Sequence, residues 1–411
     1  MSQKVLVAGT GKSGIAAAKL LLAMGGEVVL YDGNDKLDPE KIKENFEEDA
    51  KVTVVLGELT RPDLLGVELS IISPGIPLDA PFVPVLDEAK IPIWSEIQLA
   101  YHVAKGRLIA ITGTNGKTTT TALTGAIMKT FFNEVFVVGN IGIPYTDVAL
   151  DTTEKSVTVA EVSSFQLETI MDFHPNVSAI TNITPDHLDR YDHCMQNYID
   201  AKFRITQNQT TDDAFIFWND DPIIKQELAK HGLKAHLYPF AAVKEDGAIA
   251  YVEDHEVKIT EPIAFNMEQE ELALTGQHNL YNSLAAGISA NLAGITKENI
   301  RKALSDFKGV EHRLEKVARV RGIDFINDSK ATNVNSCWYA LQSMTTKTVL
   351  ILGGKDKGND YTEIEDLVRE KCSALVYLGL HNEKLHAFFD RFGLPVADVQ
   401  TGMKDAVEAA Y

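Results

Sequence analysis

The sequence predicts an α/β protein of two or three domains, in which parallel strands are joined by helices. Short apolar runs rich in Val and Ile alternate with longer segments of helical periodicity along nearly the whole chain, as in parallel sheets with crossover helices. The chain has 411 residues, which at about 150 residues per domain corresponds to two or three domains. No repeat of fixed period interrupts the pattern.

The first two blocks of strands and helices occupy residues 1–95 and 96–308. The first contains strands at 4–9, 27–32, 69–76 and 91–95, with a helix through Ile15–Met24. The second opens with a strand, a glycine turn and a helix over 108–130 and ends in a Leu- and Ala-rich helical stretch around 280–306. Within it, 245–274 holds nine acidic residues and one lysine around short alternating apolar runs. We interpret this segment as a solvated edge of strands.

The third block, 309–411, contains apolar strands at 322–327, 348–353 and 374–380. Residues 301–330 hold eight basic residues against five acidic ones, which indicates a place where anions could bind. The chain stops in TGMKDAVEAAY, which predicts an amphipathic helix. Each earlier helix of this block leads into a strand, so we expect the domain to need a further strand and helix.

Charge and composition exclude several classes of protein. The 39 Lys and Arg against 58 Asp and Glu give a formal net charge of −19, which argues against binding to nucleic acid or to an anionic membrane surface. The three cysteines, Cys194, Cys337 and Cys372, lie far apart and support neither a disulfide framework nor a zinc site. No run approaches the ~18 apolar residues of a membrane-spanning helix. We expect a soluble, cytoplasmic protein.

The first glycine turn, GTGKSG at 9–14, lies between a strand and a helix. The next strand ends at Asp32, 18 residues after Gly14. Such a turn brings backbone N–H groups close to a phosphate, and an acidic strand end can bond a sugar or a base. The pattern alone leaves open a dinucleotide such as NAD(P) or a more general diphosphate.

The second glycine turn, GTNGKT at 113–118, is more specific. It places backbone donors, a lysine and a hydroxyl at one helix N-terminus, which suits a triphosphate with Mg²⁺. The general P-loop pattern has glycine where this chain has Ile111, so the turn is a shortened variant. The alternative is a merely structural turn.

Two strand ends that follow carry polar side chains. Glu161 ends one apolar strand, and Asp186 and His187 follow the next strand after Asn182. A carboxylate and an imidazole beside a phosphate loop would complete a divalent-metal site. The alternatives are a helix-capping role for Glu161 and an ordinary surface position for His187. For Lys202, in YIDAKFRI, the residues alone favour a solvated lysine.

Later motifs offer further ligands. Asn279, in GQHN, can bond a purine or a phosphate, or can simply cap a helix. Asp328 and Lys330 lie within NDSKATN at a strand tip, where a carboxylate and a lysine suit a ribose and a developing anion. Lys357, in GGKDKG, either holds a substrate carboxylate or lies in a solvated turn.

Seven motifs, taken in order, resemble those of the Mur ligase family: GTNGKTTTT, EVSSFQLE, TNITPDHLDRY, the YxxAK lysine, GQHNxxN, EHR and NDSKATN. The GxGxxG start and DSKATN are similar to those of the branch that adds D-glutamate to UDP-N-acetylmuramoyl-L-alanine. The resemblance implies three domains: a Rossmann-like N-terminal domain for the UDP-sugar, a central P-loop ATPase-type parallel-sheet domain, and a C-terminal Rossmann-like domain for the amino acid.

The resemblance also implies roles for single residues. ATP would contact Gly113, Thr114, Asn115, Gly116, Lys117, Thr118, Thr119, Asn279, Arg313 and Asp328. Two Mg²⁺ ions would be held by Thr118, Glu161, His187 and Lys202, the last as a carbamate (N6-carboxylysine). The UDP-linked substrate would contact Ser13, Asp32, Ser73, Gly75, Asn140 and Ser163, and the amino acid Lys330, Thr332 and Lys357. The catalytic residues would be Lys117, His187, Lys202 and Lys330.

The implied reaction is ATP-dependent amide-bond formation through an acyl phosphate, in peptidoglycan precursor synthesis. We expect a monomer that binds no nucleic acid and does not insert into membranes. Three alternatives remain: another Mur-type or folylpolyglutamate-type ligase, a nucleotide-binding module with incomplete chemistry, and a dehydrogenase that uses the first glycine turn.

Overall fold

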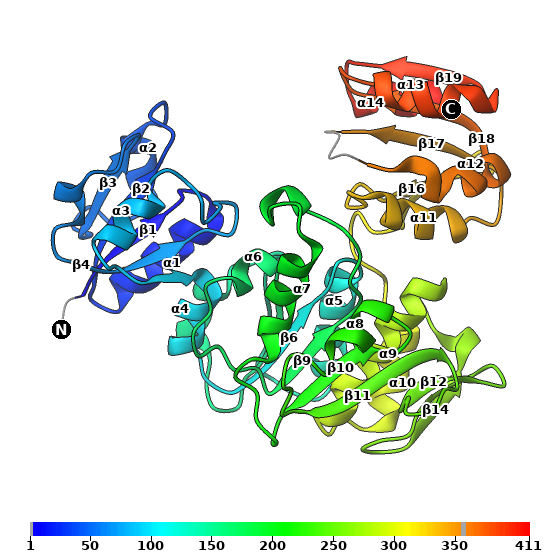
Figure 1. The fold of residues 1–411 in the computed structure, drawn as a ribbon. Coiled ribbons are helices and arrows are strands. Elements are labelled where there is room, and N and C mark those ends of the chain that lie inside the picture. The colour runs from blue at the N-terminus through cyan, green and yellow to red at the C-terminus, as the bar shows by residue number, and fades with distance from the viewer. Residues whose placement is uncertain (1–2, 355–358) are drawn as a thin grey trace. The chain divides into compact units, whose positions relative to one another are not determined.

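The computed structural model describes residues 3–354 and 359–411, and the predicted α/β class is confirmed (Figure 1). The chain divides into two compact units. The first contains Met1–Ala273 and Tyr281–Phe307, and the second contains Leu274–Leu280 and Lys308–Tyr411. The two units are described separately below.

The first five strands form one parallel sheet in the order β3-β2-β1-β4-β5. They are β1 (Lys4–Ala8), β2 (Glu27–Asp32), β3 (Val52–Leu56), β4 (Val67–Ile72) and β5 (Ile93–Ser95). The connecting helices are α1 (Lys12–Ala23), α2 (Pro39–Lys43), the 3-10 helix η1 (Arg61–Leu64) and α3 (Val83–Glu88). Strand β1 is central and its Val5, Leu6, Val7 and Ala8 side chains are fully buried, which explains its unbroken apolar run.

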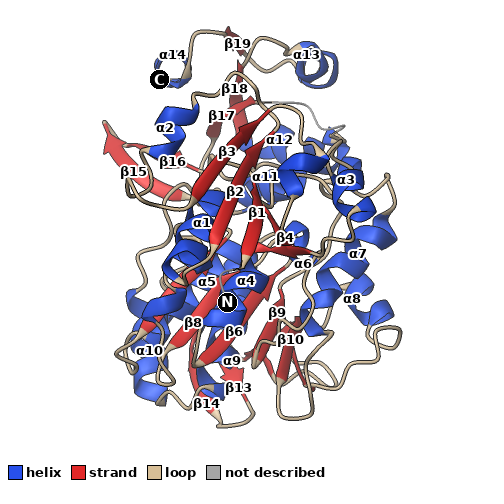
Figure 2. Cartoon of the chain, turned by 90° about the vertical axis from the view of Figure 1, so that its left-hand side faces the viewer, coloured by secondary structure: helices blue, strands red, loops and turns tan. Residues whose placement is uncertain are grey.

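A nine-stranded sheet forms the rest of the first unit, in the order β14-β13-β12-β11-β10-β9-β6-β8-β7. Its strands are β6 (Arg107–Thr112), β7 (Val135–Gly139), β8 (Val157–Glu161), β9 (Val177–Ile180), β10 (Ala214–Trp218), β11 (His236–Val243), β12 (Ala250–Glu253), β13 (Glu256–Ile259) and β14 (Phe265–Glu268). Figure 2 shows four of these strands, β8, β6, β9 and β10, side by side.

Strands β6 to β12 pair in parallel, whereas β12, β13 and β14 form an antiparallel edge. This edge is the acidic segment, and its prediction as solvated strands is confirmed. Val257, Ile259, Phe265 and Met267 are buried and alternate with more exposed residues, so one face packs on the core and the other meets water.

The helices of this part are α4 (Glu96–Val103), α5 (Lys117–Met128), α6 (Ser164–Leu167), α7 (Met195–Phe203), α8 (Pro222–Glu227), α9 (Gln277–Leu292) and α10 (Lys297–Asp306). Short 3-10 helices are η2 (Tyr145–Asp147), η3 (Ala149–Asp151), η4 (Leu188–Arg190), η5 (Arg204–Thr206) and η6 (Gln269–Glu271). The Ala-rich stretch forms two helices instead of one because Gly294 adopts a φ of +79°, after which Thr296 caps α10.

The second unit has a hairpin of β15 (Glu315–Val320) and β16 (Ile323–Asn327), and a parallel sheet of β17 (Thr348–Gly353), β18 (Cys372–Leu378) and β19 (Val396–Val399). Its helices are α11 (Val334–Gln342), η7 (Tyr361–Ile364), α12 (Glu365–Lys371), α13 (Glu383–Phe389), η8 (Asp390–Phe392) and α14 (Met403–Ala410). The helix predicted in the last residues is confirmed as α14. Strand β15 was not predicted, because it is almost wholly exposed and its residues, EKVARV, do not alternate between apolar and polar side chains.

None of the helices in the described residues combines the length and the apolar character needed to cross a membrane. Cys194, Cys337 and Cys372 are free thiols, as their spacing predicted.

Candidate active site

The second glycine turn joins β6 to α5 and leaves room for backbone only. Gly113 and Gly116 have φ values of +140° and +84°, which glycine adopts far more easily than other residues. A Cβ atom on Gly113 would overlap Oγ1 of Thr181, and one on Gly116 would overlap Oδ1 of Asn282. The loop therefore approaches neighbouring strands and α9 closely, and backbone N–H groups at this helix start suit a phosphate.

Side chains within and around the loop fix its shape. Oγ1 of Thr114 donates to the carbonyl oxygen of Thr184 at 3.0 Å and accepts from the Thr184 N–H at 3.0 Å. The same hydroxyl lies 3.0 Å from the hydroxyl of Tyr198. The N–H of Asn115 donates to Oδ1 of Asn182 at 3.0 Å. These contacts tie the loop to the segment that follows β9 and to helix α7.

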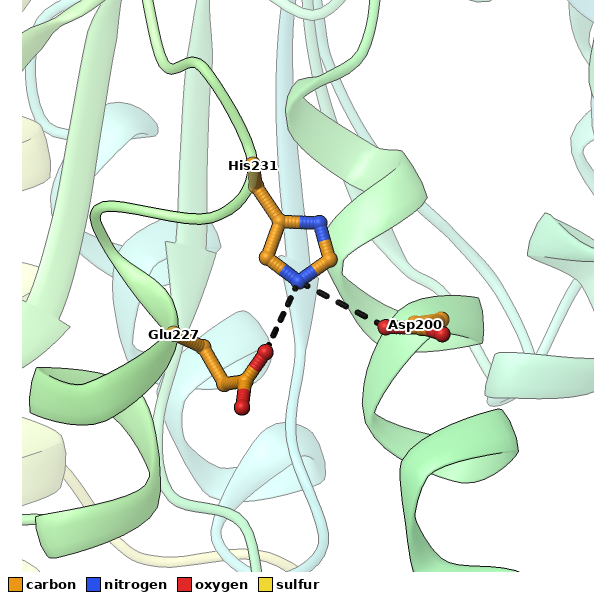
Figure 3. A group of neighbouring side chains, drawn as sticks. All are labelled: Asp200, Glu227 and His231. Atoms are coloured by element: carbon orange, nitrogen blue, oxygen red, sulfur yellow. Dashed lines mark hydrogen bonds and ion pairs between the residues drawn. The ribbon is translucent and has the colours of Figure 1, made fainter.

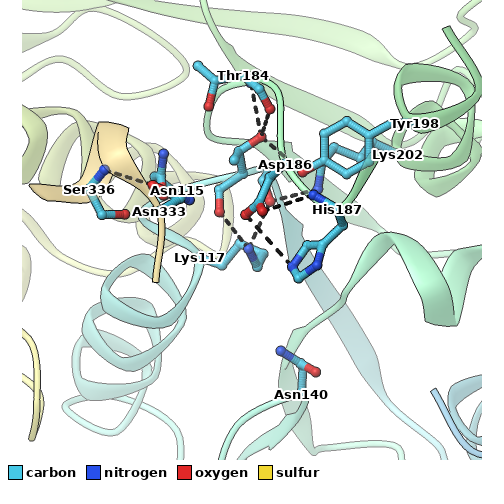
Figure 4. A network of polar contacts seen from close by, with 12 residues as sticks. Asn115, Lys117, Asn140, Thr184, Asp186, His187, Tyr198, Lys202, Asn333 and Ser336 are labelled. Carbon is cyan, nitrogen blue, oxygen red and sulfur yellow. Dashed lines mark hydrogen bonds and ion pairs between the residues drawn. The ribbon is translucent and has the colours of Figure 1, made fainter. Parts of the chain in front are cut away.

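Two lysines converge on the first residue of the loop (Figure 4). Nζ of Lys117 donates to the carbonyl oxygens of Gly113 at 2.9 Å and Thr114 at 2.8 Å, and Nζ of Lys202 donates to the same Gly113 oxygen at 2.7 Å. Lys202 is only 2% exposed, so the solvated position favoured by the residues alone was wrong. Burial, reinforced by the nearby Lys117 cation, holds the pKa of Lys202 well below its ordinary value.

Glu161 ends β8 beside this loop and is 2% exposed. Its Oε1 accepts a 2.9 Å hydrogen bond from Nδ2 of Asn140, whereas its buried Oε2 has no hydrogen-bond partner among the described residues. The alternative of a helix-capping role was wrong, because α6 is capped by Ser163, whose Oγ accepts from the N–H of Gln166 at 3.3 Å. A buried carboxylate oxygen without a donor is suited to a cation.

Asp186 and His187 lie in the turn after β9 and face the same loop (Figure 4). The Asp186 side chain is 10% exposed and that of His187 is 40% exposed, with 3.7 Å between Oδ2 of Asp186 and Nε2 of His187. The His187 ring packs edge-on against Phe165, with 5.2 Å between the ring centroids. His187 has a φ of +52°, a conformation that non-glycine residues adopt infrequently.

The first glycine turn, at the edge of the N-terminal sheet, is closed by Asp32. Oδ2 of Asp32 accepts from the N–H of Thr10 at 3.2 Å and from its hydroxyl at 2.7 Å. Helix α1 begins after Gly11, which provides no side-chain cap for the helix N–H groups, and Ser13 lies in its first turn. Ser73 follows β4, and its N–H donates to the carbonyl oxygen of Ala8 at 3.0 Å. The structure thus brings Ser13, Asp32, Ser73 and Gly75 to the carboxyl ends of neighbouring strands.

The second unit contains the predicted residues of the later motifs. Asn279 is the third residue of α9, not its cap, and its Nδ2 donates to the carbonyl oxygen of Thr275 at 2.9 Å. Burial raises the pKa of Asp328, whose Oδ1 accepts from the Leu314 N–H at 3.1 Å, and Arg313 partly opposes the increase. Burial and the same arginine lower the pKa of His278 to about 4.

The remaining predicted residues of this unit are more open. Lys330 and Thr332 are exposed, and the Lys330 N–H donates to the carbonyl oxygen of His312 at 3.2 Å. Lys357 lies outside the described residues.

Family models match most of the chain. A Mur ligase MurD-like N-terminal domain matches residues 3–95, a Mur ligase middle domain matches 111–290, and a Mur ligase glutamate ligase domain matches 312–411. The chain belongs to the Mur ligase family. Mur ligases are ATP-dependent ligases, in agreement with the nucleotide loop.

Curated Mur ligases are similar to the chain along its length. A UDP-N-acetylmuramoylalanine–D-glutamate ligase of Bacteroides thetaiotaomicron is 71% identical over 411 residues, covering 100% of this chain and 91% of the relative. One of Porphyromonas gingivalis is 45% identical, covering 99% and 90%. The solved UDP-N-acetylmuramate-alanine ligase MurC of Thermotoga maritima shares the fold, with a TM-score of 0.62, 18% identity, and coverage of 98% of this chain and 91% of that one.

Mur ligases use ATP with Mg²⁺, and the residues around the loop fit such a cation. The fit rests on the buried Oε2 of Glu161, to which no residue in the described part of the chain donates, and on Lys202, whose lowered pKa favours a neutral amine. Only a neutral amine can react with CO₂ to form a carbamate, which would replace a cation by an anionic oxygen ligand.

A second group of candidate metal ligands, Asp200, Glu227 and His231, differs because its carboxylates already accept hydrogen bonds from protein donors (Figure 3). Nε2 of His231 lies 3.3 Å from Glu227 and 3.6 Å from Asp200. Nε2 of Gln196 donates to both carboxylates, at 2.8 Å to Asp200 and 3.1 Å to Glu227, and Lys230 lies 2.5 Å from Glu227. Burial opposes ionisation of Glu227, yet these donors hold its pKa below the ordinary value. Protein donors thus already satisfy this cluster.

Three residues of the site lie within the quoted motifs, but the sequence did not predict their contacts. Tyr198 lies four positions before Lys202 on α7, a spacing that places both on one helix face and could have indicated its role. Asn282 packs against Gly116 and accepts from the hydroxyl of Thr120 at 3.1 Å. Arg190 contacts backbone carbonyl groups, and such contacts leave no signal in the sequence.

Proposed function

We propose that this protein is an ATP-dependent ligase that joins D-glutamate to UDP-N-acetylmuramoyl-L-alanine in peptidoglycan precursor synthesis. The observation that carries the proposal is the 71% identity, over the whole chain, to a UDP-N-acetylmuramoylalanine–D-glutamate ligase. The convergence of Lys117 and Lys202 on Gly113 beside a buried carboxylate supports the ATP-dependent step.

The proposal divides the chain into a UDP-sugar domain at 1–95, an ATPase domain at 96–308 and an amino-acid domain at 309–411. The shared edge of β1, β2 and β4 supports a UDP-substrate site formed by Ser13, Asp32, Ser73 and Gly75. Asn140 and Ser163 would contact the muramoyl part of the same substrate.

ATP would bind the loop from Gly113 to Thr119, with Lys117 on its phosphates. Asn279, Arg313 and Asp328 would also contact the nucleotide. Thr118, Glu161, His187 and a carbamate on Lys202 would hold two Mg²⁺ ions. When bound, Mg²⁺ offsets the negative charge that gathers on the phosphates.

The reaction proceeds in two substitutions. The carboxylate of the alanyl group attacks the γ-phosphorus of ATP, so that ADP leaves and an acyl phosphate forms. Lys117 stabilises the charge on the transferred group. Lys330, Thr332 and Lys357 would hold D-glutamate. Its amine then attacks the acyl carbon and loses a proton, and inorganic phosphate leaves with the former carboxylate oxygen. The chain's contribution is to position the reactants and stabilise their charges.

The test measures phosphate release from ATP with UDP-N-acetylmuramoyl-L-alanine and Mg²⁺, with D-glutamate present, absent, or replaced by L-glutamate. We expect release that requires D-glutamate and yields one new amide per phosphate. Release without any D-glutamate dependence would instead support a nucleotide-binding module with incomplete chemistry. In a separate assay with NADH, consumption of NADH would support the dehydrogenase.

Two further expectations accompany the reaction. Because ATP and nucleotide-linked sugars are cytoplasmic metabolites, the proposed reaction assigns the protein to the cytoplasm. The expected monomeric state stays a prediction that light scattering on the purified protein can check.

A further inference from the structure

Arg190 ends η4, three residues after His187, and its long side chain is largely buried. The side chain is 13% exposed, and its guanidinium carbon lies 4.0 Å above the centre of the Phe165 ring. Nη2 of Arg190 is 3.0 Å from Oε2 of Glu168, whose side chain is also 13% exposed. A buried, stacked and ion-paired guanidinium is held in one orientation.

That orientation aims the guanidinium at the loop after β4. Nη1 of Arg190 donates to the carbonyl oxygen of Pro74 at 2.8 Å, and Nη2 donates to that of Ile76 at 3.1 Å. The loop is otherwise fixed to its own sheet by Ser73, whose N–H donates to Ala8, and by a turn in which the Ile76 N–H donates to Ser73 at 3.0 Å. Arg190 therefore links the loop of residues 73–76 to the turn that carries His187.

We propose that Arg190 is a positioning residue. It holds the loop of residues 73–76, and the UDP-linked substrate bound there, at a fixed position relative to the ATP site. The inference rests on the proposed function, which assigns Ser73 and Gly75 to that substrate. One end of the substrate would bind the N-terminal sheet, whereas its carboxylate must meet ATP beside Lys117. A misplacement of about 1 Å at reacting groups can cost roughly 100-fold in rate, so the link between the two places matters.

The chemistry of the contact requires arginine. Its planar fork donates to two carbonyl oxygens and a carboxylate at once, whereas a lysine ammonium is a compact charge on a flexible stem. Arg190→Lys keeps the charge and loses the fork, which makes it the informative variant. Glu168→Gln keeps both carbonyl contacts and removes the ion pair that orients the guanidinium.

Arg204 offers a matched control. It also donates to two backbone carbonyl oxygens, those of Leu167 and Ile170, both at 2.7 Å. Neither acceptor belongs to the loop of residues 73–76. Arg204 also interacts electrostatically with Glu168, and Arg204→Lys keeps the positive charge, so the variant removes a comparable fork and retains that interaction.

The first measurement is hydrogen–deuterium exchange of the full-length protein, read on peptides that cover residues 70–82. We expect faster exchange in Arg190→Lys, a smaller increase in Glu168→Gln, and exchange like that of the wild type in Arg204→Lys. The second measurement is steady-state phosphate release. We expect kcat to fall about tenfold or more in Arg190→Lys and the KM for UDP-N-acetylmuramoyl-L-alanine to rise, with the KM for ATP within about twofold of the wild type.

Two results would overturn the inference. One is unchanged exchange over residues 70–82 in Arg190→Lys. The other is faster exchange with equal changes in both KM values, because a general loss of structure would affect both substrates. A wild-type protein that releases no phosphate would overturn the proposed function itself and the substrate half of this inference, and the exchange result would still decide whether Arg190 holds the loop.

Discussion

Nζ of Lys202 donates a 2.7 Å hydrogen bond to the carbonyl oxygen of Gly113, the first residue of the nucleotide loop. The lysine reaches this oxygen from α7, which lies far along the chain from the loop. Lys117 donates to the same oxygen, so two ammonium groups compete for one acceptor in a buried place. Such crowding favours the neutral amine of Lys202, and the function of this lysine therefore depends on something other than a positive charge.

Replacing Lys202 by alanine is expected to lower D-glutamate-dependent phosphate release by at least about 100-fold, as for other preorganised charge-stabilising groups. If the working form is a carbamate, acetate or propionate at millimolar concentrations will restore part of the rate, because each supplies the missing carboxylate. Steady-state assays across a series of short-chain acids provide the measurement.

Lys117→Ala is the matched control for this rescue. Its loss removes a cation from the phosphates, so added carboxylates should restore nothing. Equal rescue of both variants, or none for Lys202→Ala, would contradict a carbamate on Lys202.

Gly116→Ala tests how tightly the nucleotide loop is packed. The variant forces an alanine into a φ of +84° and drives its Cβ into Oδ1 of Asn282, so the loop must move. We expect ATP affinity, measured by calorimetry, to fall at least about tenfold, since a shift of one or two kcal/mol suffices for such a change.

Gly232→Ala separates the overlap from the backbone strain. Gly232 also has a positive φ, +55°, but an added Cβ meets no atom of the described residues within 4 Å. It should lower the melting temperature slightly and leave ATP affinity unchanged. If both variants bind ATP equally well, the close approach to Asn282 has no role in binding.

The sequence was sufficient for the parts of the site that depend on local pattern. The strand, glycine turn and helix around Gly113 and Gly116 follow from residue types in adjacent positions. The acidic edge at β12 to β14 followed in the same way, because alternation of apolar and charged residues identifies a half-buried strand.

Burial of single polar side chains could not be predicted in this way. Lys202 has the composition of an exposed helix position, and only the packing of α7 against the loop excludes it from water. The contacts of Arg190 depend on where the carbonyl groups of Pro74 and Ile76 lie, about 115 positions earlier in the chain. Such contacts arise from tertiary structure, and no local motif encodes them.

Glu161→Gln is expected to raise the Mg²⁺ concentration needed for half-maximal phosphate release by about tenfold or more. The change replaces a buried carboxylate whose Oε2 has no donor within residues 3–354 and 359–411, so the metal-free protein should lose no thermal stability. Mg²⁺ titrations of activity and melting curves in a chelator provide the two readings.

Glu227→Gln is a matched control, because Glu227 is also 2% exposed. Its carboxylate has protein donors, Gln196 and Lys230, so its loss should lower the melting temperature and leave the Mg²⁺ requirement unchanged. An unchanged Mg²⁺ requirement in Glu161→Gln would exclude this carboxylate as a ligand.

His278 makes the second unit sensitive to acid. Burial and Arg313 lower its pKa to about 4, against 6.5 for an ordinary histidine. The unfolded chain therefore takes up a proton below pH 6.5 that the folded unit refuses until about pH 4. The contribution of His278 to the free energy of unfolding is fully present above pH 6.5. Below pH 6.5 it falls by about 1.4 kcal/mol per pH unit, or about 2 kcal/mol by pH 5.

The measurement is denaturant unfolding followed by fluorescence of Trp338, in a chain whose Trp94 and Trp218 are replaced by phenylalanine. His278→Gln should flatten the decline between pH 6.5 and 5 by removing the group that titrates. His381→Gln removes a histidine of the same unit whose side chain is 89% exposed, and it should preserve the decline. A decline of equal slope in His278→Gln and in the parent chain would show that other groups cause it.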